Sequence, residues 1–190
     1  MMQKKIAGAG VAIITPFTPA GEIDYPALEK LVQMHIDCGT DFLCVHGTTG
    51  ETPTLTVEEK RESRKRIIEQ VAGRLPIMLG LGGNNTQAVV NELRNEDLTG
   101  IDAILSIVPY YNKPNQEGMY QHFKAIAAAT ELPIYLYNVP GRTGVQEYRW
   151  PQSRVGQSAA DFASHRHYAQ GLFGSLGRRC AHNGYYEIGR

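Results

Sequence analysis

The feature that most constrains the fold is an alternation of short apolar runs with amphipathic helical patterns along residues 1–145. Each run is too short for a typical helix and mostly lacks polar alternation, which is typical of strands buried on both faces. The runs cover residues 10–15, 41–46, 76–81, 101–108 and 133–137. Such a repeated β-α unit predicts a parallel sheet with right-handed crossovers.

Helical patterns fill the intervals between the apolar runs. The first covers residues 25–36, and its apolar stripe consists of Leu28, Leu31, Val32 and Ile36. Thr56 and Glu59 have the spacing of a capping box at the start of a second helix, which we expect over 56–68. A third helix is expected to begin at Asn85 and Thr86, and a fourth to cover 119–130.

Two architectures fit this repeat. A doubly wound sheet normally carries a glycine-rich phosphate fingerprint after its first strand, but here the first run ends in Thr15 and Pro16. In a (β/α)8 TIM barrel, functional residues follow the carboxyl ends of many strands. Polar clusters follow four of the runs, at residues 47–51, 82–85, 109–112 and 138–144. We therefore predict an α/β fold of the TIM-barrel type, incomplete, with about five of the eight βα units and strands six to eight missing.

Composition excludes several function classes. Nineteen basic residues balance nineteen acidic ones, whereas nucleic-acid binders and polybasic membrane binders carry a basic excess. No apolar run approaches the length of a transmembrane helix, and the amino-terminal residues do not match a signal peptide. The three cysteines lack metal-ligand spacing, and the simplest interpretation is a cytoplasmic protein with free thiols. We expect no metal and no cofactor.

Charge divides the chain near residue 145. Residues 1–145 hold 13 basic and 16 acidic residues, a net of −3, and residues 146–190 hold six Arg, no Lys and three acidic residues, a net of +3. A change of reading frame produces such a shift, because base composition rather than selection then determines which residues are encoded. We expect 1–145 to be the amino-terminal part of the barrel and 146–190 to be a non-homologous, frameshifted tail. A genuine divergent carboxyl terminus and a fused segment are the alternatives.

Three motifs give the first 145 residues a family likeness. GTTGE at 47–51, PYYNKPNQEGMYQHF at 109–123 and YNVPGRTG at 137–144 resemble the dihydrodipicolinate (4-hydroxy-tetrahydrodipicolinate) synthase family. The resemblance implies a homotetrameric barrel that condenses pyruvate with L-aspartate 4-semialdehyde through a lysine Schiff base. The reaction lies on the route to diaminopimelate and lysine. Another pyruvate-dependent aldolase, such as N-acetylneuraminate lyase, is the alternative within the superfamily.

The resemblance also implies roles for five residues. Thr48, Tyr111 and Tyr137 match the family's catalytic hydroxyl relay, with Tyr111 crossing to a neighbouring subunit. Thr49 matches a residue that holds the ketoacid, and Arg142 matches one that binds the carboxylate of the semialdehyde. Hydroxyls beside a helix amino terminus, phenols and a guanidinium suit these tasks chemically.

The same residues also have purely structural interpretations. The two threonines can be a helix N-cap, the tyrosines packing or interface aromatics, and the arginine a solvated loop residue. His46, which directly precedes GTTGE, is expected to be a packing residue at the barrel end rather than a catalyst.

One family feature is missing. The resemblance places the Schiff-base lysine close to His165, but the last lysine of this chain is Lys124. Because imine formation requires a primary amine, we expect these 190 residues to be inactive as a synthase. A truncated non-catalytic product or a pseudoenzyme is the non-enzyme alternative.

Feedback inhibition by lysine is expected to be weak. Val57, Lys60 and Ala88 stand where the resemblance implies that lysine-sensitive members have two histidines and a glutamate. An apolar side chain and an ammonium group do not attract a cationic amino acid.

Overall fold

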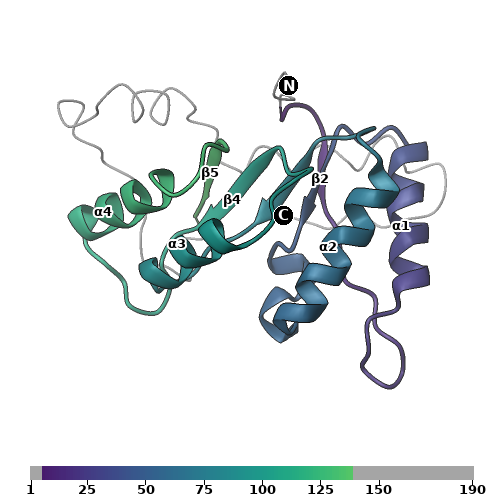
Figure 1. Cartoon of the computed structure of the whole chain (residues 1–190), viewed down its shortest axis with the longest axis horizontal. Helices are drawn as coiled ribbons and strands as arrows, with labels where there is room; N and C mark the ends of the chain where they lie inside the picture. The colour runs from purple at the N-terminus through teal and green to yellow at the C-terminus, as the bar shows by residue number, and fades with distance from the viewer. Residues whose placement is uncertain (1–5, 139–190) are drawn as a thin grey trace. The chain divides into compact units, whose positions relative to one another are not determined.

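Strands and helices alternate through the whole described part of the chain. The structure is a computed structural model that describes residues 6–138. Its strands are β1 Gly10–Ala12, β2 Phe42–Val45, β3 Ile77–Gly80, β4 Ala103–Ile107 and β5 Ile134–Tyr137. Its helices are α1 Tyr25–Asp37, α2 Val57–Val71, α3 Thr86–Asn95 and α4 Gln116–Ala127, with short 3-10 turns η1 Thr48–Gly50 and η2 Thr52–Thr54 before α2 (Figure 1). The predicted alternation is confirmed.

The sheet has the strand order of a barrel. Its five strands lie in the order β1-β2-β3-β4-β5. The registers Gly10↔Phe42, Leu43↔Ile77 and Ile104↔Ile134 all belong to parallel pairs. A doubly wound sheet reverses its strand order at a switch point, and this order contains no reversal. The arrangement is that of a partial (β/α) barrel, while the tail expected over 146–190 lies outside the described residues.

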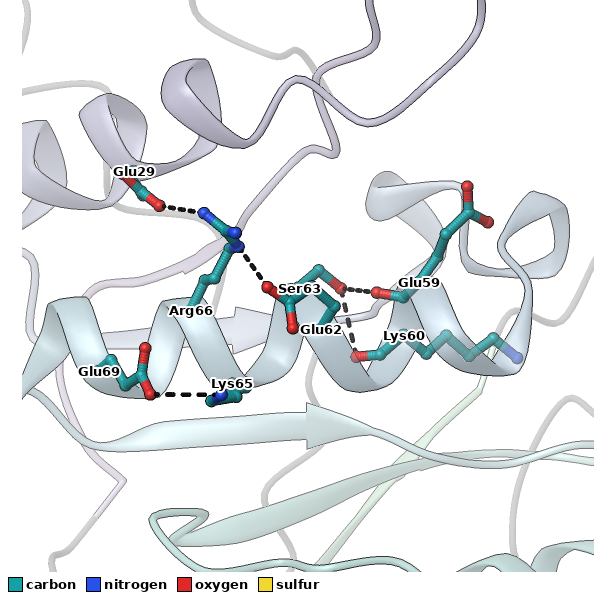
Figure 2. Close-up of polar contacts among 8 residues, drawn as sticks. All are labelled: Glu29, Glu59, Lys60, Glu62, Ser63, Lys65, Arg66 and Glu69. Atoms are coloured by element: carbon teal, nitrogen blue, oxygen red, sulfur yellow. Dashed lines mark hydrogen bonds and ion pairs between the residues drawn. The ribbon is translucent and has the colours of Figure 1, made fainter.

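The described residues fall into two compact units. The first comprises 6–79 with 100–102, and α1 packs against α2 within it. Arg66 of α2 joins the two helices, because its Nη1 lies 2.9 Å from Glu29 of α1 and its Nε 2.6 Å from Glu62 (Figure 2). Its guanidinium also lies 4.4 Å from the ring centroid of Tyr25. This charged group therefore connects the two helices of the first unit.

The second unit comprises 80–99 with 103–138. Here β4 pairs with β5, and α3 packs against α4. Thr86 at the start of α3 is hydrogen-bonded to His122 of α4 at 2.8 Å. Gly82 is required where it stands, because a Cβ there would lie 2.7 Å from the backbone nitrogen of Ile107. The second unit thus brings the chain after β3 directly against the end of β4.

Several helix boundaries differ from the predictions. The α4 helix begins at Gln116 rather than 119, because the Oδ1 of Asn115 accepts a hydrogen bond from the Gly118 amide at 2.8 Å. It ends at Ala127 rather than 130, and α2 continues to Val71, three residues past its expected end. The capping box of Thr56 and Glu59 is confirmed.

The buried stripe of α1 is also shifted. It consists of Leu28, Val32 and His35, so a histidine takes the place expected for Ile36. His35 is accommodated there because its Nδ1 is hydrogen-bonded to the hydroxyl of Thr40 at 3.3 Å. No helix among residues 6–138 is long and apolar enough to span a membrane.

Candidate functional site

The predicted site residues belong to different units. Thr48 and Thr49 lie in the first unit, directly after β2. Tyr111 and Tyr137 lie in the second unit, in the loop after β4 and at the end of β5. Each therefore follows or ends a strand, as the barrel prediction requires. Arg142 lies outside the described residues.

The chain changes direction sharply after β2. His46 has a φ of +56°, in the left-handed region, and Gly47 is extended with ψ 178°. The η1 turn follows, and Glu51 returns to the left-handed region with φ +51°. The amide of Gly50 donates to the Gly47 carbonyl at 3.0 Å, and the amide of Glu51 donates to the Thr48 carbonyl at 3.1 Å. The GTTGE segment is therefore a hydrogen-bonded turn rather than an open loop.

Two side-chain hydroxyls donate hydrogen bonds to carbonyls of this turn. The Thr15 hydroxyl, just beyond β1, donates to the carbonyl of Gly50 at 2.7 Å. The Thr52 hydroxyl donates to the carbonyl of Gly47 at 3.0 Å. Gly50 packs closely here, since a Cβ would lie 3.2 Å from the Ile13 carbonyl oxygen. The backbone of the turn is fixed before any ligand arrives.

His46, which directly precedes the turn, is buried. Only 8% of it is exposed, and its Nε2 lies 2.9 Å from the Ser63 hydroxyl on α2. Burial, followed by the charges of Arg64 and Lys60, lowers the pKa of His46 to about 4. The imidazole is therefore neutral near pH 7. Its burial fits the packing position expected from the sequence.

The turn presents Thr48 and Thr49 to solvent. Both residues are exposed, while Gly47 and Gly50 on either side are buried. The first N–H groups of a helical turn have no partner inside the turn, and here they belong to these two threonines. Exposed amides and hydroxyls in this arrangement suit a carboxylate ligand. Among residues 6–138, no group of three or more His, Cys, Asp or Glu side chains is arranged to hold a metal ion.

The loop after β4 carries two exposed tyrosines. Tyr111 is 86% exposed with a φ of +67°, and Tyr110 is 41% exposed. The hydrogen bonds that join this loop to the chain after β3 are long. Asn84 Nδ2 donates to the Tyr110 carbonyl at 3.5 Å, and Asn112 Nδ2 donates to the Asn84 carbonyl at 3.3 Å. A large aromatic side chain in a strained, exposed position is typical of an interaction surface.

Tyr137 is placed by the sheet itself. It is the last residue of β5, it is paired with Ile107, and its carbonyl accepts a hydrogen bond from the Val108 amide at 3.0 Å. The residue is partly exposed, so its side chain is not sealed in the core. A phenol on a rigid strand end is a suitable proton carrier for chemistry at that edge.

Thr15, which bonds to the turn, and Ser63, which bonds to the preceding His46, were not expected from the sequence to have a part in the site. Thr15 was assigned only to the end of a strand, and Ser63 only to a helix. Both act through hydrogen bonds to residues far away in the sequence, Gly50 and His46. Neither contact has a local sequence signal.

Comparison with known proteins gives a consistent result. The Dihydrodipicolinate synthetase family matches residues 5–147. The 4-hydroxy-tetrahydrodipicolinate synthase of Phocaeicola vulgatus is 61% identical over 145 residues, which cover 76% of this chain and 49% of that protein. The enzyme of the same name from Enterococcus faecalis is 56% identical over 135 residues, covering 70% of this chain and 46% of that protein. The chain therefore spans about half the length of the relatives that it matches.

Solved structures show the same likeness. Dihydrodipicolinate synthase from Bacillus anthracis superposes with a TM-score of 0.71 at 48% identity, covering 75% of this chain and 49% of that one. The chloride-inhibited synthase from Acinetobacter baumannii, solved in complex with pyruvate, gives a TM-score of 0.71 at 50% identity, covering 74% and 48%. The partial barrel and the order of its elements are thus features of known synthases.

Proposed function

The chain belongs to the dihydrodipicolinate synthetase family, and on that basis we propose a function in diaminopimelate and lysine biosynthesis. The proposed reaction is that of a lyase, the condensation of pyruvate with L-aspartate 4-semialdehyde through a lysine Schiff base in the cytoplasm. A homotetramer is the proposed assembly of a full-length parent. No nucleic acid or membrane enters the proposal, and no metal or cofactor is invoked.

The observation that carries the proposal is the hydrogen-bonded turn after β2. Its backbone is held by Thr15 and Thr52, while Thr48 and Thr49 remain exposed. We propose that Thr49 binds the carboxylate of pyruvate with its amide and hydroxyl. Preorganised donors bind an anion well, because they need not be ordered when it arrives.

The remaining site residues are proposed for proton transfer and for binding the second substrate. Thr48, Tyr111 and Tyr137 form the proposed hydroxyl relay, with Tyr111 contributed across a subunit interface. The exposure and the strained backbone of Tyr111 support a position that faces a partner. Arg142 is the proposed clamp for the semialdehyde carboxylate, which a guanidinium can grip with two hydrogen bonds.

The 190 residues are proposed to bind pyruvate without catalysing the condensation. No lysine follows Lys124, which lies on α4. An imine that supports an aldol reaction needs a primary amine of lowered pKa beside the substrate. This absence favours the non-catalytic product or pseudoenzyme as the second candidate function for the chain as it stands.

Two measurements on the same protein test the proposal. Pyruvate is titrated into ¹⁵N-threonine-labelled chain, and the amide signals of Thr48 and Thr49 should shift and saturate. Thr49→Val should weaken binding about tenfold, the effect of losing one hydrogen bond to a charged group, whereas Thr99→Val, at an exposed threonine of the second unit, should not.

The second measurement is incubation with pyruvate and borohydride, followed by intact-mass determination. An unchanged mass is expected, since the proposed imine lysine is not among these residues. A reduced covalent pyruvate adduct on a lysine would overturn the non-catalytic proposal. Threonine amides that do not respond to pyruvate would overturn the binding proposal.

A further inference from the structure

The chain enters the GTTGE turn through His46, whose backbone conformation is unusual. Its φ of +56° is unusual for a residue other than glycine, although histidine is among the types that tolerate it best. Such a conformation persists only where the surroundings enforce it. The next residue, Gly47, already belongs to the segment that presents Thr48 and Thr49. Whatever holds His46 therefore also orients the turn.

The hydrogen bonds of Ser63 identify the tautomer of His46. The Ser63 hydroxyl donates its single proton to the carbonyl of Glu59, 2.7 Å away, with the Lys60 carbonyl at 3.3 Å (Figure 2). It can then only accept from His46, whose Nε2 lies 2.9 Å away. His46 is thus the donor, and its proton is on Nε2.

This bond joins the end of β2 to the helix of the same β-α unit. Ser63 is itself buried, and its other hydrogen bond anchors it within the first two turns of α2. The amino-terminal end of that helix is fixed in turn by the reciprocal bonds of the capping box. The imidazole is therefore held by a rigid element.

We propose that His46 is a positioning residue, which donates its Nε2–H to Ser63 and thereby fixes the turn that carries Thr48 and Thr49. This goes beyond the packing function expected from the sequence, since packing alone needs volume but not a donor. The consequence for pyruvate affinity rests on the proposed function, whereas the consequence for the turn does not.

Three substitutions separate the donor from the backbone requirement. His46→Asn tolerates the left-handed backbone but is too short to reach Ser63. His46→Gln restores an N–H donor at about the reach of Nε2. Ser63→Ala removes the acceptor and leaves His46 unchanged. The matched control is His35→Asn, since His35 is also 8% exposed and hydrogen-bonded to a hydroxyl, that of Thr40, but lies on α1.

The turn is monitored by residue-resolved hydrogen–deuterium exchange in the full chain. The amides of Gly50 and Glu51 report on it, because their hydrogen bonds close the turn. His46→Asn and Ser63→Ala should each accelerate exchange of these two amides about fivefold. In His46→Gln the exchange rate should largely return to that of the parent chain. His35→Asn should leave both amides unchanged. Equal exchange in His46→Asn, Ser63→Ala and the parent would overturn the proposal.

A measurement on the unaltered chain guards against variants that fail to fold. Long-range ¹H–¹⁵N spectra of the imidazole should show the proton of His46 on Nε2 near pH 7. A proton on Nδ1 would overturn the proposal without any substitution.

Pyruvate titration of the same variants separates the two proposals. If exchange responds as expected and pyruvate affinity falls in parallel, both proposals are supported. If exchange responds but pyruvate does not bind even the parent chain, the positioning proposal stands and the proposed function fails.

Discussion

The loops after β2 and β4 carry comparable motifs but are built in opposite ways. The turn after β2 is held by the hydroxyls of Thr15 and Thr52 and directly follows the buried His46. The loop after β4 has left-handed residues at Tyr111 and Lys113, and its amide contacts to Asn84 are 3.3 and 3.5 Å long. One loop is held by its own unit, and the other leaves its largest side chain exposed.

The difference shows what each loop is suited to do. A turn fixed in advance can bind a small anion without being ordered by it. An exposed aromatic side chain loses solvent contact only when another surface covers it. Substitutions should therefore cost stability in the first loop and hardly any in the second.

Among changes that involve the turn after β2, acidification should lower the free energy of unfolding the most. The pKa of His46 is about 4 in the folded chain, below its ordinary value of 6.5, so the unfolded chain binds the proton first. The contribution of His46 is complete above pH 6.5 and is lost as the pH falls toward 4, a total of about 3 kcal/mol. Urea unfolding at pH 7 and pH 4.5 measures this loss, which His46→Asn should reduce. An equal loss in parent and variant would contradict a buried neutral imidazole.

Removing the Thr15 hydroxyl should have the next largest effect. Thr15→Val keeps the shape of the side chain but leaves the Gly50 carbonyl without this donor, at a cost of about 1–2 kcal/mol. The control is Thr18→Val, because the Thr18 hydroxyl accepts only an exposed bond of 3.3 Å from the Glu22 amide. If the two variants unfold at the same urea concentration, Thr15 does not hold the turn.

Removing the N-cap hydroxyl of α2, which lies in the same unit as the turn after β2, should lower stability by a smaller amount. Thr56→Ala eliminates the hydroxyl that accepts from the Glu59 amide at 3.1 Å, and this should cost about 1 kcal/mol. Glu59→Gln retains an acceptor for the Thr56 amide and should be nearly neutral. Thermal unfolding of both variants measures the difference, and a loss that is larger for Glu59→Gln would count against the capping box.

Substitution in the loop after β4 should have the smallest effect. Tyr111→Gly removes an exposed ring and places glycine at a φ of +67°, so the free energy of unfolding should change by less than about 1 kcal/mol. Chemical unfolding of the full chain checks this. A clear destabilisation would show that the ring packs within its own unit, which would remove the contrast between the two loops.

The pattern of apolar runs was sufficient to predict the strands and most of the helices. Strand composition and caps such as Thr56 with Glu59 are local signals, and local signals can be recognised in a sequence. The start of α4 differs from the expected residue 119, because Asn115 is the N-cap and the helix begins at Gln116. The segments 47–51 and 109–112 follow β2 and β4 as expected, since a barrel locates polar motifs after its strands, whereas most of the motif at 137–144 lies outside the described residues.

The construction of the turn could not be predicted in the same way. The bond from Thr15 spans 35 residues and the bond between His46 and Ser63 spans 17, so both depend on how the elements pack. A histidine in the left-handed region has no sequence signature, unlike a glycine in a turn. Long-range hydrogen bonds, rather than residue preferences, define this part of the candidate site.

The pairing of β1, β2 and β3 in chain order has a consequence for biosynthesis on the ribosome. Each of these strands pairs with the next one along the chain, and their helices α1 and α2 pack on each other, so most contacts of the first unit are complete once β3 has emerged. Among the described residues the exception is the segment 100–102, in which the Asp102 carboxylate accepts from the Ile77 amide at 2.9 Å and the Asp102 amide donates to the Ile77 carbonyl at 2.8 Å. Folding of this unit can therefore follow the order of translation, with Asp102 closing it after α3 has been synthesised.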